Sequence, residues 1–199
     1  MPKMESPLLS VIIPTYNEEK TLKKIIKRVQ DAKPKNKEII VVDDFSTDKT
    51  KEILKNLRKE IKIIKHLENK GKGESIKTGL EHVTGKITII QDADLEYNPE
   101  DYKKIIGPIL KGETRVVYGS RFLENDIYTK TKFYYGNKFL SLLTSIIYNQ
   151  KITDMETCYK AMRTDLFKSL KLKSKNFEIE PVPDKKTAKP KERNHMGMY

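Results

Sequence analysis

The stretch ITIIQDADLEY (residues 87–97) joins a run of apolar and β-branched residues to three acids at alternate positions, Asp92, Asp94 and Glu96. Short runs of this kind, which are rich in Ile and lead into polar residues, are typical of a buried strand that stops at the edge of a sheet. The stretch therefore predicts a strand over 86–91 and a group of carboxylates at its carboxyl end.

Four further runs of Val and Ile repeat this pattern, and each of them leads into polar or acidic residues. They predict strands at LLSVIIP (8–14), EIIVVDD (38–44), IKIIKH (61–66) and RVVYGS (115–120). Between the strands, apolar residues three and four positions apart predict helices that pack on a core. These helices cover 22–29, 51–57 and a segment from Pro99 to Lys111.

The alternation of such strands and helices is typical of an α/β fold, in which a mostly parallel sheet is flanked by helices. In open sheets of this type, ligands bind at the carboxyl ends of the strands. Three polar stretches fall at these ends, namely PTYNEE (14–19), VVDDFSTDKT (41–50) and QDADLEY (91–97). We therefore expect the functional site where these stretches meet.

The composition indicates one folded domain that attracts anions. Its 199 residues suit a single core, and its formal charge of +12 favours nucleotide phosphates, an acidic membrane surface or nucleic acid. We expect no nucleic-acid partner, because no basic and aromatic readout motif accompanies the charge. The lack of a G-x-G-x-x-G after the first strand and of a P-loop argues against a nicotinamide cofactor and a P-loop ATPase.

The composition of individual segments also predicts the boundaries of the folded domain and the cellular compartment of the protein. We expect an N-terminal extension at 1–7, a folded domain at 8–180 and a disordered or foreign tail at 181–199, where no apolar period remains. A single cysteine, Cys158, cannot form an internal disulfide, and the first residues do not have the features of a signal peptide. These features predict a cytoplasmic protein. The most apolar later segment, 139–148, is too short to cross a bilayer.

The acids of the opening stretch need a partner if they lie close together. Two carboxylates about 4 Å apart repel each other by roughly 4 kcal/mol at an effective dielectric constant near 20. Protonation of one acid or a bound divalent cation relieves this repulsion, and oxygen ligands at alternate positions suit Mg²⁺ or Mn²⁺. Otherwise Asp92, Asp94 and Glu96 form a solvated acidic turn in which the side chains point apart.

Two aspartates end the second predicted strand, and they also allow two interpretations. Asp43 and Asp44 either cap the turn into the next helix or accept hydrogen bonds from a nucleobase or a ribose. Tyr16, after the first strand, either stacks on a base or covers the turn.

Two more polar stretches at this edge also have a structural and a functional interpretation. Thr15 and Glu18 have the spacing of a capping box at the start of a helix. The stretch NKGKGES (69–75) is typical of a mobile loop; in the alternative interpretation, Lys70 or Lys72 contacts a phosphate.

Six blocks of the chain, taken in order, resemble family 2 glycosyltransferases with the GT-A fold, and in particular the branch of dolichyl-phosphate mannose and glucose synthases. The blocks are SVIIPTYNEE (10–19), VVDDFSTDKT (41–50), NKGKGESIKTGL (69–80), QDADLEYNPED (91–101), VVYGSRF (116–122) and DMETCYKAMR (154–163). The resemblance covers about residues 8–181 and implies a Rossmann-like GT-A domain of the nucleotide-diphospho-sugar transferase type.

The resemblance implies a GDP- or UDP-linked mannose or glucose as donor, and Mg²⁺ or Mn²⁺ as cofactor. The donor-binding positions carried over are Pro14, Thr15, Tyr16, Glu18, Asp43, Asp44, Lys70, Gly71, Asp92 and Ala93. The metal ligands carried over are Asp92, Asp94 and Glu96, and the catalytic positions are Asp94, Arg121 and Asp154. Arg121 is expected to contact a phosphate, because a guanidinium matches phosphate oxygens in geometry.

The acceptor that the resemblance implies is a polyprenyl phosphate in a cytoplasmic leaflet. Its phosphate is already an anion near pH 7, so it can attack the anomeric carbon with inversion and without a general base. A hydroxyl acceptor needs a base, for which Asp154 is the candidate; otherwise Asp154 braces its loop. The segment 133–148 either lies on the membrane surface or packs in the core.

The resemblance weakens at the C-terminal end. Relatives continue past FEIEP (177–181) with a helix and a strand, whereas this chain turns into a lysine-rich tail. We therefore expect a domain that is incomplete at its C-terminus, with exposed apolar surface from 133–148 that favours homo-oligomers. The alternatives to polyprenyl-phosphate transfer are transfer to a saccharide or protein hydroxyl and a non-catalytic module that binds a sugar nucleotide.

Overall fold

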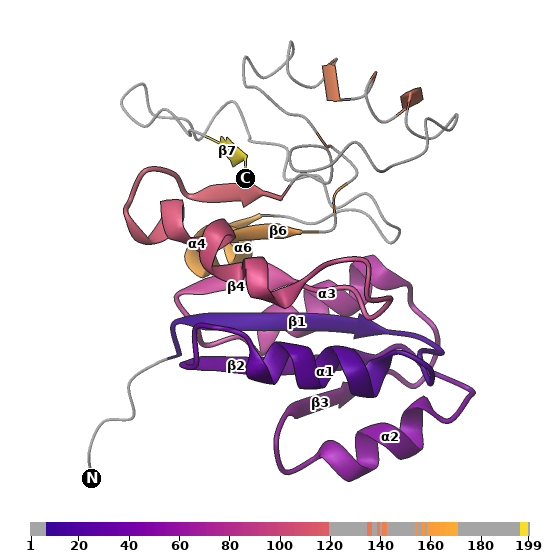
Figure 1. Cartoon of the computed structure of the whole chain (residues 1–199). Coiled ribbons are helices and arrows are strands. Elements are labelled where there is room, and N and C mark those ends of the chain that lie inside the picture. Colours follow the sequence, from indigo (N-terminus) through magenta and orange to yellow (C-terminus); the bar gives the residue numbers. More distant parts are fainter. Residues whose placement is uncertain are drawn as a thin grey trace, which may run out of the picture.

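The computed structural model describes residues 7–119, 135–136, 139, 141–142, 154, 157, 159–170 and 196–198. In this part of the chain, seven strands form one sheet in the order β3-β2-β1-β4-β6-β5-β7 (Figure 1). The strands are β1 (Leu9–Thr15), β2 (Lys37–Asp43), β3 (Lys62–Lys65), β4 (Ile87–Ile90), β5 (Val116–Tyr118), β6 (Lys160–Arg163) and β7 (Met196–Met198). The five strands predicted from the sequence are all present, as β1 to β5.

The sheet is mostly parallel, as predicted. Strands β3, β2, β1 and β4 run in one direction, and β6 runs antiparallel to both β4 and β5. The carboxyl ends of β1, β2 and β4 therefore lie at one edge of the sheet. Because β6 runs the other way, with Ala161 opposite Ile89, the chain that enters β6 arrives at this same edge.

Helices cover both faces of the sheet (Figure 1). They are α1 (Leu22–Asp31), α2 (Thr50–Leu57), α3 (Lys72–Glu81), the 3-10 helix η1 (Pro99–Asp101), α4 (Tyr102–Leu110) and α6 (Thr164–Ser169). Residues of α1, α2 and α4 pack with Val11 and Ile13 on one face, and residues of α3 and α6 pack with Ile12 on the other. Alternate residues of β1 thus face opposite layers, which explains why this strand is apolar along most of its length.

Helix α3 is the main element that the sequence did not predict. We expected a mobile loop over 69–75, whereas the helix begins at Lys72 after Gly71, whose φ of 89° lies in the region that favours glycine. A side chain at Gly79 would bring its Cβ within 2.6 Å of the Ile12 Cγ2 atom, so the absence of a side chain lets α3 approach β1 closely. The glycines that obscured the helix in the sequence are therefore the residues that allow it to pack.

The predicted capping box at Thr15 and Glu18 is wrong. The Thr15 hydroxyl donates to the carbonyl of Ile13, and the helix begins only at Leu22. The Glu18 carboxylate instead accepts a hydrogen bond from the Thr21 hydroxyl at 2.5 Å. Residues 16–21 are therefore loop, where the capping box required the start of the helix, and this loop belongs to the carboxyl edge.

The predictions for the chain ends and for the membrane fall mostly outside the described residues. In the tail, the structure describes only β7, which runs parallel to β5. The predicted boundaries at 7 and 180 stay predictions. Within the described residues, no helix combines the length and the apolar character that a membrane span needs.

Candidate functional site

The loops after β1 and β2 are joined by hydrogen bonds and form one wall of the carboxyl edge. The backbone N–H of Asn17 donates to the Ser46 hydroxyl at 3.0 Å, and the Asn17 side-chain oxygen accepts from the backbone N–H of Thr47 at 2.7 Å. The N–H of Glu18 donates to the Thr50 hydroxyl at 2.9 Å. Asn17 has a positive φ of 55°, which Asn tolerates better than most residues. Sequence reasoning missed this role, although an Asn directly after a strand is a known turn signal.

Asp43 ends β2 with one carboxylate oxygen satisfied and one open. The residue is 1% exposed, and its Oδ1 accepts from the backbone N–H of Ser46 at 3.0 Å. Its Oδ2 is buried and, within the described residues, is the one buried side-chain polar atom without a hydrogen-bond partner. A buried polar group that lacks a partner costs about 1–3 kcal/mol, and more if it is charged. Among the described residues, nothing uses this acceptor oxygen.

Asp44, the next residue, has partners on both of its oxygens. Its Oδ1 lies 2.6 Å from Nδ1 of His66 and 2.9 Å from the backbone nitrogen of Lys70, and its Oδ2 lies 2.7 Å from the backbone nitrogen of Gly71. The other nitrogen of His66 is 2.9 Å from the Thr78 hydroxyl in α3. Asp44 thus fixes the segment that leads into α3. The backbone N–H groups of Lys70 and Gly71 already donate hydrogen bonds to Asp44. The role of Asp44, Lys70 and Gly71 in donor binding stays a prediction.

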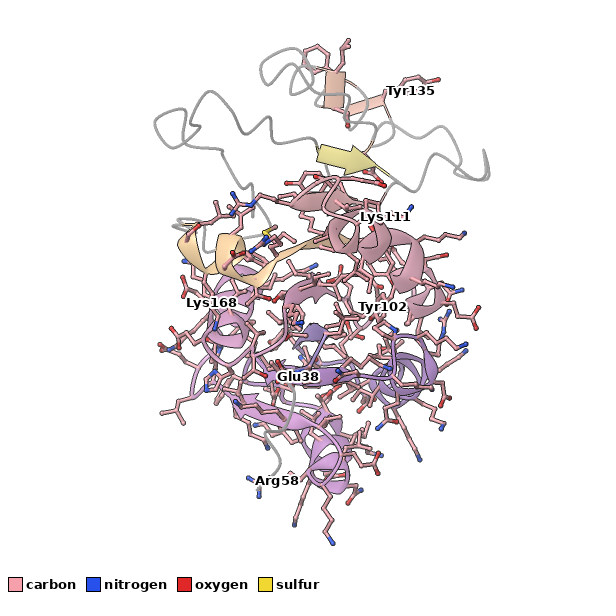
Figure 2. All side chains as sticks on the ribbon, turned by 90° about the vertical axis from the view of Figure 1, so that its left-hand side faces the viewer. Glu38, Arg58, Tyr102, Lys111, Tyr135 and Lys168 are labelled. Atoms are coloured by element: carbon pink, nitrogen blue, oxygen red, sulfur yellow. The ribbon has the colours of Figure 1, made fainter. Side chains whose placement is uncertain are left out.

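Gln91 fixes the end of β4 from within the core. Its Oε1 accepts from the hydroxyls of Tyr102 and Tyr159, each at 2.8 Å, and its Nε2 donates to the carbonyl of Asp92 at 3.0 Å. Figure 2 shows Tyr102 inside the molecule. Burial raises the pKa of Tyr102 well above its ordinary value, and burial together with the neighbouring Tyr102 raises the pKa of Tyr159. Both phenols therefore stay protonated donors across the physiological range. This support was not predicted, because its members come from three separate segments.

Asp92 faces a lysine at the start of α3. Its Oδ1 lies 2.5 Å from the ammonium nitrogen of Lys72, and the side chains of the two residues are only 12% and 18% exposed. The sequence named Lys72 only as an alternative phosphate contact, and its pairing with Asp92 depends on the packing of α3. The end of β4 therefore holds a positive charge that the chain itself supplies.

The three acids of the opening stretch do not gather into one cluster. Asp94 and Glu96 are exposed, and Oδ1 of Asp94 accepts from the backbone N–H of Glu96 at 3.0 Å around Leu95, which has a φ of 70°. Within the described ranges, no three His, Cys, Asp or Glu side chains are close enough together to hold a metal ion. The turn folds Asp94 onto its own backbone while Asp92 faces Lys72. The assignment of Asp92, Asp94 and Glu96 as metal ligands stays a prediction.

The remaining predicted site residues differ in how they are exposed. Pro14, Thr15 and Ala93 are buried, so they can contribute only their backbone or the shape of the site. Tyr16 is 48% exposed and presents its ring at the edge. Asp154 is 0% exposed. Arg121 lies outside the described residues, and so does most of 133–148.

Comparisons with known proteins relate the chain to a family. The family model described as Glycosyl transferase family 2 matches residues 10–171. The chain is 33% identical to the UDP-N-acetylglucosamine–dolichyl-phosphate N-acetylglucosaminyltransferase of Methanococcus voltae, over 88% of this chain and 78% of the relative. It is 31% identical to the dolichol-phosphate mannosyltransferase of Pyrococcus furiosus, over 86% of this chain and 50% of the relative. The chain thus spans most of the first relative but only half of the second.

A solved structure supports the fold independently. The chain is similar to glucosyl-3-phosphoglycerate synthase from Mycobacterium tuberculosis, solved with Mn²⁺, UDP and glucosyl-3-phosphoglycerate, with a TM-score of 0.66. The likeness covers 82% of this chain and 59% of that chain at 22% identity. At this identity the comparison bears on the fold, and the predicted GT-A class is confirmed.

Proposed function

This chain belongs to glycosyl transferase family 2, and we propose that it transfers a sugar from a nucleoside-diphosphate donor to a polyprenyl phosphate. The sugar is mannose or glucose, and the name of the Methanococcus relative adds N-acetylglucosamine as a third donor sugar to test. An oxygen of the acceptor phosphate forms the new bond to the anomeric carbon while the bond from that carbon to the diphosphate breaks. The nucleoside diphosphate leaves with the electron pair, and the anomeric carbon is inverted.

The open oxygen of Asp43 is the observation that carries the proposal. Uracil and guanine both present a ring N–H, and a buried carboxylate oxygen without a partner is suited to accept it. The ring of Tyr16, exposed after the neighbouring strand, offers a surface on which such a base can stack. The two residues follow paired strands, since Thr15 lies opposite Asp43 in the sheet. A nucleoside therefore finds both a polar and an aromatic contact at one edge.

Asp92 and Asp94 are the residues that we propose to hold Mg²⁺ or Mn²⁺. The donor set fits, because carboxylate oxygens suit these ions and because Asp92 already holds a positive charge, the ammonium of Lys72. When bound, the ion neutralises the charge that develops on the leaving diphosphate. Asp94 is exposed at the same turn and can reach outward, whereas Glu96 remains a weaker candidate, since the described side chains form no three-acid cluster.

The burial of Asp154 favours a phosphate acceptor over a hydroxyl acceptor. A general base needs an oxygen that can reach the proton that it removes. Asp154 is 0% exposed and already has an interaction partner, whereas the similarly buried Asp43 keeps one oxygen without a hydrogen-bond partner. A phosphate acceptor needs no base, because it is already an anion. The bracing role of Asp154 is therefore the better supported alternative. We also propose that Arg121 contacts a phosphate, as the family resemblance implies.

Three exposed apolar side chains support an acceptor that is held in a membrane. Tyr135, Phe139 and Leu142 have helical backbones and are 59%, 65% and 60% exposed. In the sequence they stand four and three positions apart, which is the spacing of residues that share one side where the backbone is helical. Figure 2 shows Tyr135 far from Tyr102 and beyond the body of the sheet. We propose that this side contacts the cytoplasmic membrane face; contact with a second copy is the alternative, which the apolar side chains also allow.

The test of the base pocket replaces Asp43 by Asn and compares two ligands. Calorimetry with the whole chain, Mn²⁺ and either GDP or UDP measures nucleotide affinity, and inorganic pyrophosphate with Mn²⁺ serves as the ligand without a base. The Asp43→Asn change keeps the Oδ1 acceptor for Ser46 but sets an amide N–H₂ against the base N–H. We expect a loss of about 10- to 100-fold for the nucleotide and little change for pyrophosphate. Equal losses for both ligands would contradict the assignment of Asp43 to the base.

A second assay tests the acceptor. Wild-type chain with GDP-mannose, UDP-glucose or UDP-N-acetylglucosamine is offered a polyprenyl phosphate in vesicles, and the matched control is the same polyprenol without phosphate. We expect product from the phosphate only. Product from the unphosphorylated alcohol, or from a free saccharide alone, would favour a hydroxyl acceptor. Nucleotide binding without transfer to any of these acceptors would favour a non-catalytic binding module.

A further inference from the structure

Phe45, in the loop after β2, has a backbone conformation that its side chain disfavours. Its φ is 65°, a region where a bulky side chain crowds the backbone and where Gly, Asn or Asp is the usual residue. Hydrogen bonds hold the loop in this shape. The N–H of Ser46 donates to Oδ1 of Asp43 at 3.0 Å, and the Ser46 hydroxyl accepts from the N–H of Asn17 at 3.0 Å. The loop would therefore be less strained with a residue other than phenylalanine.

The side chain of Phe45 does not repay this strain by packing in the core. The residue is 41% exposed and belongs to neither of the two apolar clusters that flank the sheet. The ammonium nitrogen of Lys51 lies 5.0 Å from the centroid of its ring. A cation–π contact at an exposed site contributes little to stability. Within the described residues, the fold therefore gives no reason for an aromatic ring at this position.

A second exposed aromatic residue follows the neighbouring strand. Tyr16 comes directly after β1 and is 48% exposed. The hydrogen bond from Asn17 to Ser46 joins the residues that follow Tyr16 and Phe45, so the two loops are fixed to each other. Between these loops, β2 ends at Asp43, whose buried Oδ2 has no hydrogen-bond partner. Two exposed rings and one unused acceptor suit a flat ligand that carries an N–H group.

We propose that Phe45 is a second aromatic contact for the nucleobase of the donor, beside Tyr16. This inference rests on the proposed function, because the base is the one whose N–H is assigned to Asp43. Every nucleobase has a π-face, so stacking on Phe45 adds affinity for uracil and for guanine alike, while Asp43 recognises the ring N–H. Contact with the base explains why this loop keeps a strained aromatic residue.

The proposal predicts that one substitution acts in opposite directions on folding and on binding. Asn tolerates a positive φ better than Phe, so Phe45→Asn should melt at the wild-type temperature or up to about 4 °C above it. Its affinity for GDP and UDP at saturating Mn²⁺ should fall about tenfold. Its affinity for inorganic pyrophosphate with Mn²⁺ should change little, because that ligand has no base. Thermal unfolding and calorimetry of the whole chain measure these quantities.

Two further variants and a control separate the ring from its bulk. Phe45→Tyr keeps an aromatic face and should bind both nucleotides like wild type. Phe45→Leu keeps apolar bulk without that face and should lose nucleotide affinity as Phe45→Asn does. The matched control is Leu110→Asn, because Leu110 is a similarly exposed apolar residue, at 51%, and ends α4. This control should bind both nucleotides and pyrophosphate like wild type.

The outcomes distinguish this inference from the proposed function. If Phe45→Asn binds GDP and UDP as tightly as wild type, Phe45 does not contact the base, and the proposed function is unaffected. If Phe45→Asn loses as much affinity for pyrophosphate as for the nucleotides, the ring supports the loop rather than the base, and the inference is contradicted. If wild type binds neither nucleotide with Mn²⁺, the proposed function fails and this inference fails with it.

Discussion

Asp44 at the end of β2 and Asp92 at the end of β4 are both buried carboxylates at one edge of the sheet, but different groups neutralise them. Asp44 accepts from two backbone N–H groups and contacts the ring of His66. Asp92 faces the side-chain ammonium of Lys72. Backbone donors cannot leave without a change in the loop, whereas a lysine side chain can rotate away. One aspartate is therefore held by the backbone of the site, and the other faces a side chain that is able to rotate.

The largest effect that this comparison predicts is on stability, through Asp44→Asn. The asparagine side chain has the same shape as aspartate, but its amide N–H₂ faces donors on Lys70, Gly71 or His66. At least one buried donor therefore loses its acceptor. We expect the free energy of unfolding to fall by about 3 kcal/mol, measured by urea denaturation of the whole chain.

Asp92→Asn is the matched control for that measurement. Its amide oxygen can still accept from Lys72, so one hydrogen bond of the pair is kept, and we expect a smaller loss of about 1–2 kcal/mol. If the two substitutions destabilise the chain equally, the distinction between a carboxylate held by the backbone and one that faces a side chain is wrong.

A smaller effect on stability is expected from the hydrogen bonds that hold Gln91, the residue before Asp92. In Tyr159→Phe, Gln91 loses one of the two hydroxyl donors to its Oε1 but keeps the donor from Tyr102. We expect the free energy of unfolding to fall by about 1 kcal/mol. Thermal unfolding measures this change, and Tyr97→Phe is the control, since its ring packs on Tyr159 with centroids 4.5 Å apart while Gln91 keeps both donors. A loss for Tyr97→Phe as large as for Tyr159→Phe would show that the hydrogen bond to Gln91 stabilises the chain no more than the contacts of another tyrosine hydroxyl in this cluster.

The same two aspartates show how far the sequence could predict this molecule. Strands β1 to β5 and helices α1, α2 and α4 were predictable, because their apolar runs have a clear period. Most of these runs are buried along that period, whereas the residues of β3 are exposed or half-buried. Helix α3 was not, since Gly71 and Gly79 weaken its signal and matter only once it packs on β1.

The edge that carries the site was predictable too, because parallel strands bring their carboxyl ends together. Which partner each acid takes was not predictable. His66 is 22 residues from Asp44, and Lys72 reaches Asp92 only from a helix that the sequence did not reveal. The absence of a three-acid cluster has the same origin, since a local hydrogen bond within the turn and a distant lysine both compete with the metal for these carboxylates.

Glu38 extends the comparison to the opposite edge of the sheet, where no ligand is proposed (Figure 2). Its Oε1 accepts from the Ser10 hydroxyl, the Thr84 hydroxyl and the backbone N–H groups of Thr84 and Gly85. Burial alone would raise the pKa of Glu38, but these hydrogen bonds outweigh it and hold the pKa below its ordinary value of 4.5. Glu38 is therefore a second fixed carboxylate beside Asp44, with donors that come mainly from the start of the neighbouring strands.

The pH dependence of stability should reveal this fixed carboxylate as the smallest of the expected effects. Because the pKa of Glu38 is lower in the folded chain than in the unfolded chain, its contribution is fully present above pH 4.5 and is lost as the pH falls through the folded value. Urea denaturation of the wild type and of Glu38→Gln between pH 6 and pH 3 measures this effect. The wild type should have the larger free energy of unfolding at pH 6, and its advantage over the variant should shrink as the pH falls. A difference that stays constant down to pH 3 would mean that the charge of Glu38 does not matter to its hydrogen bonds. Such a result would leave Asp44 as the one fixed carboxylate in the comparison whose charge is needed.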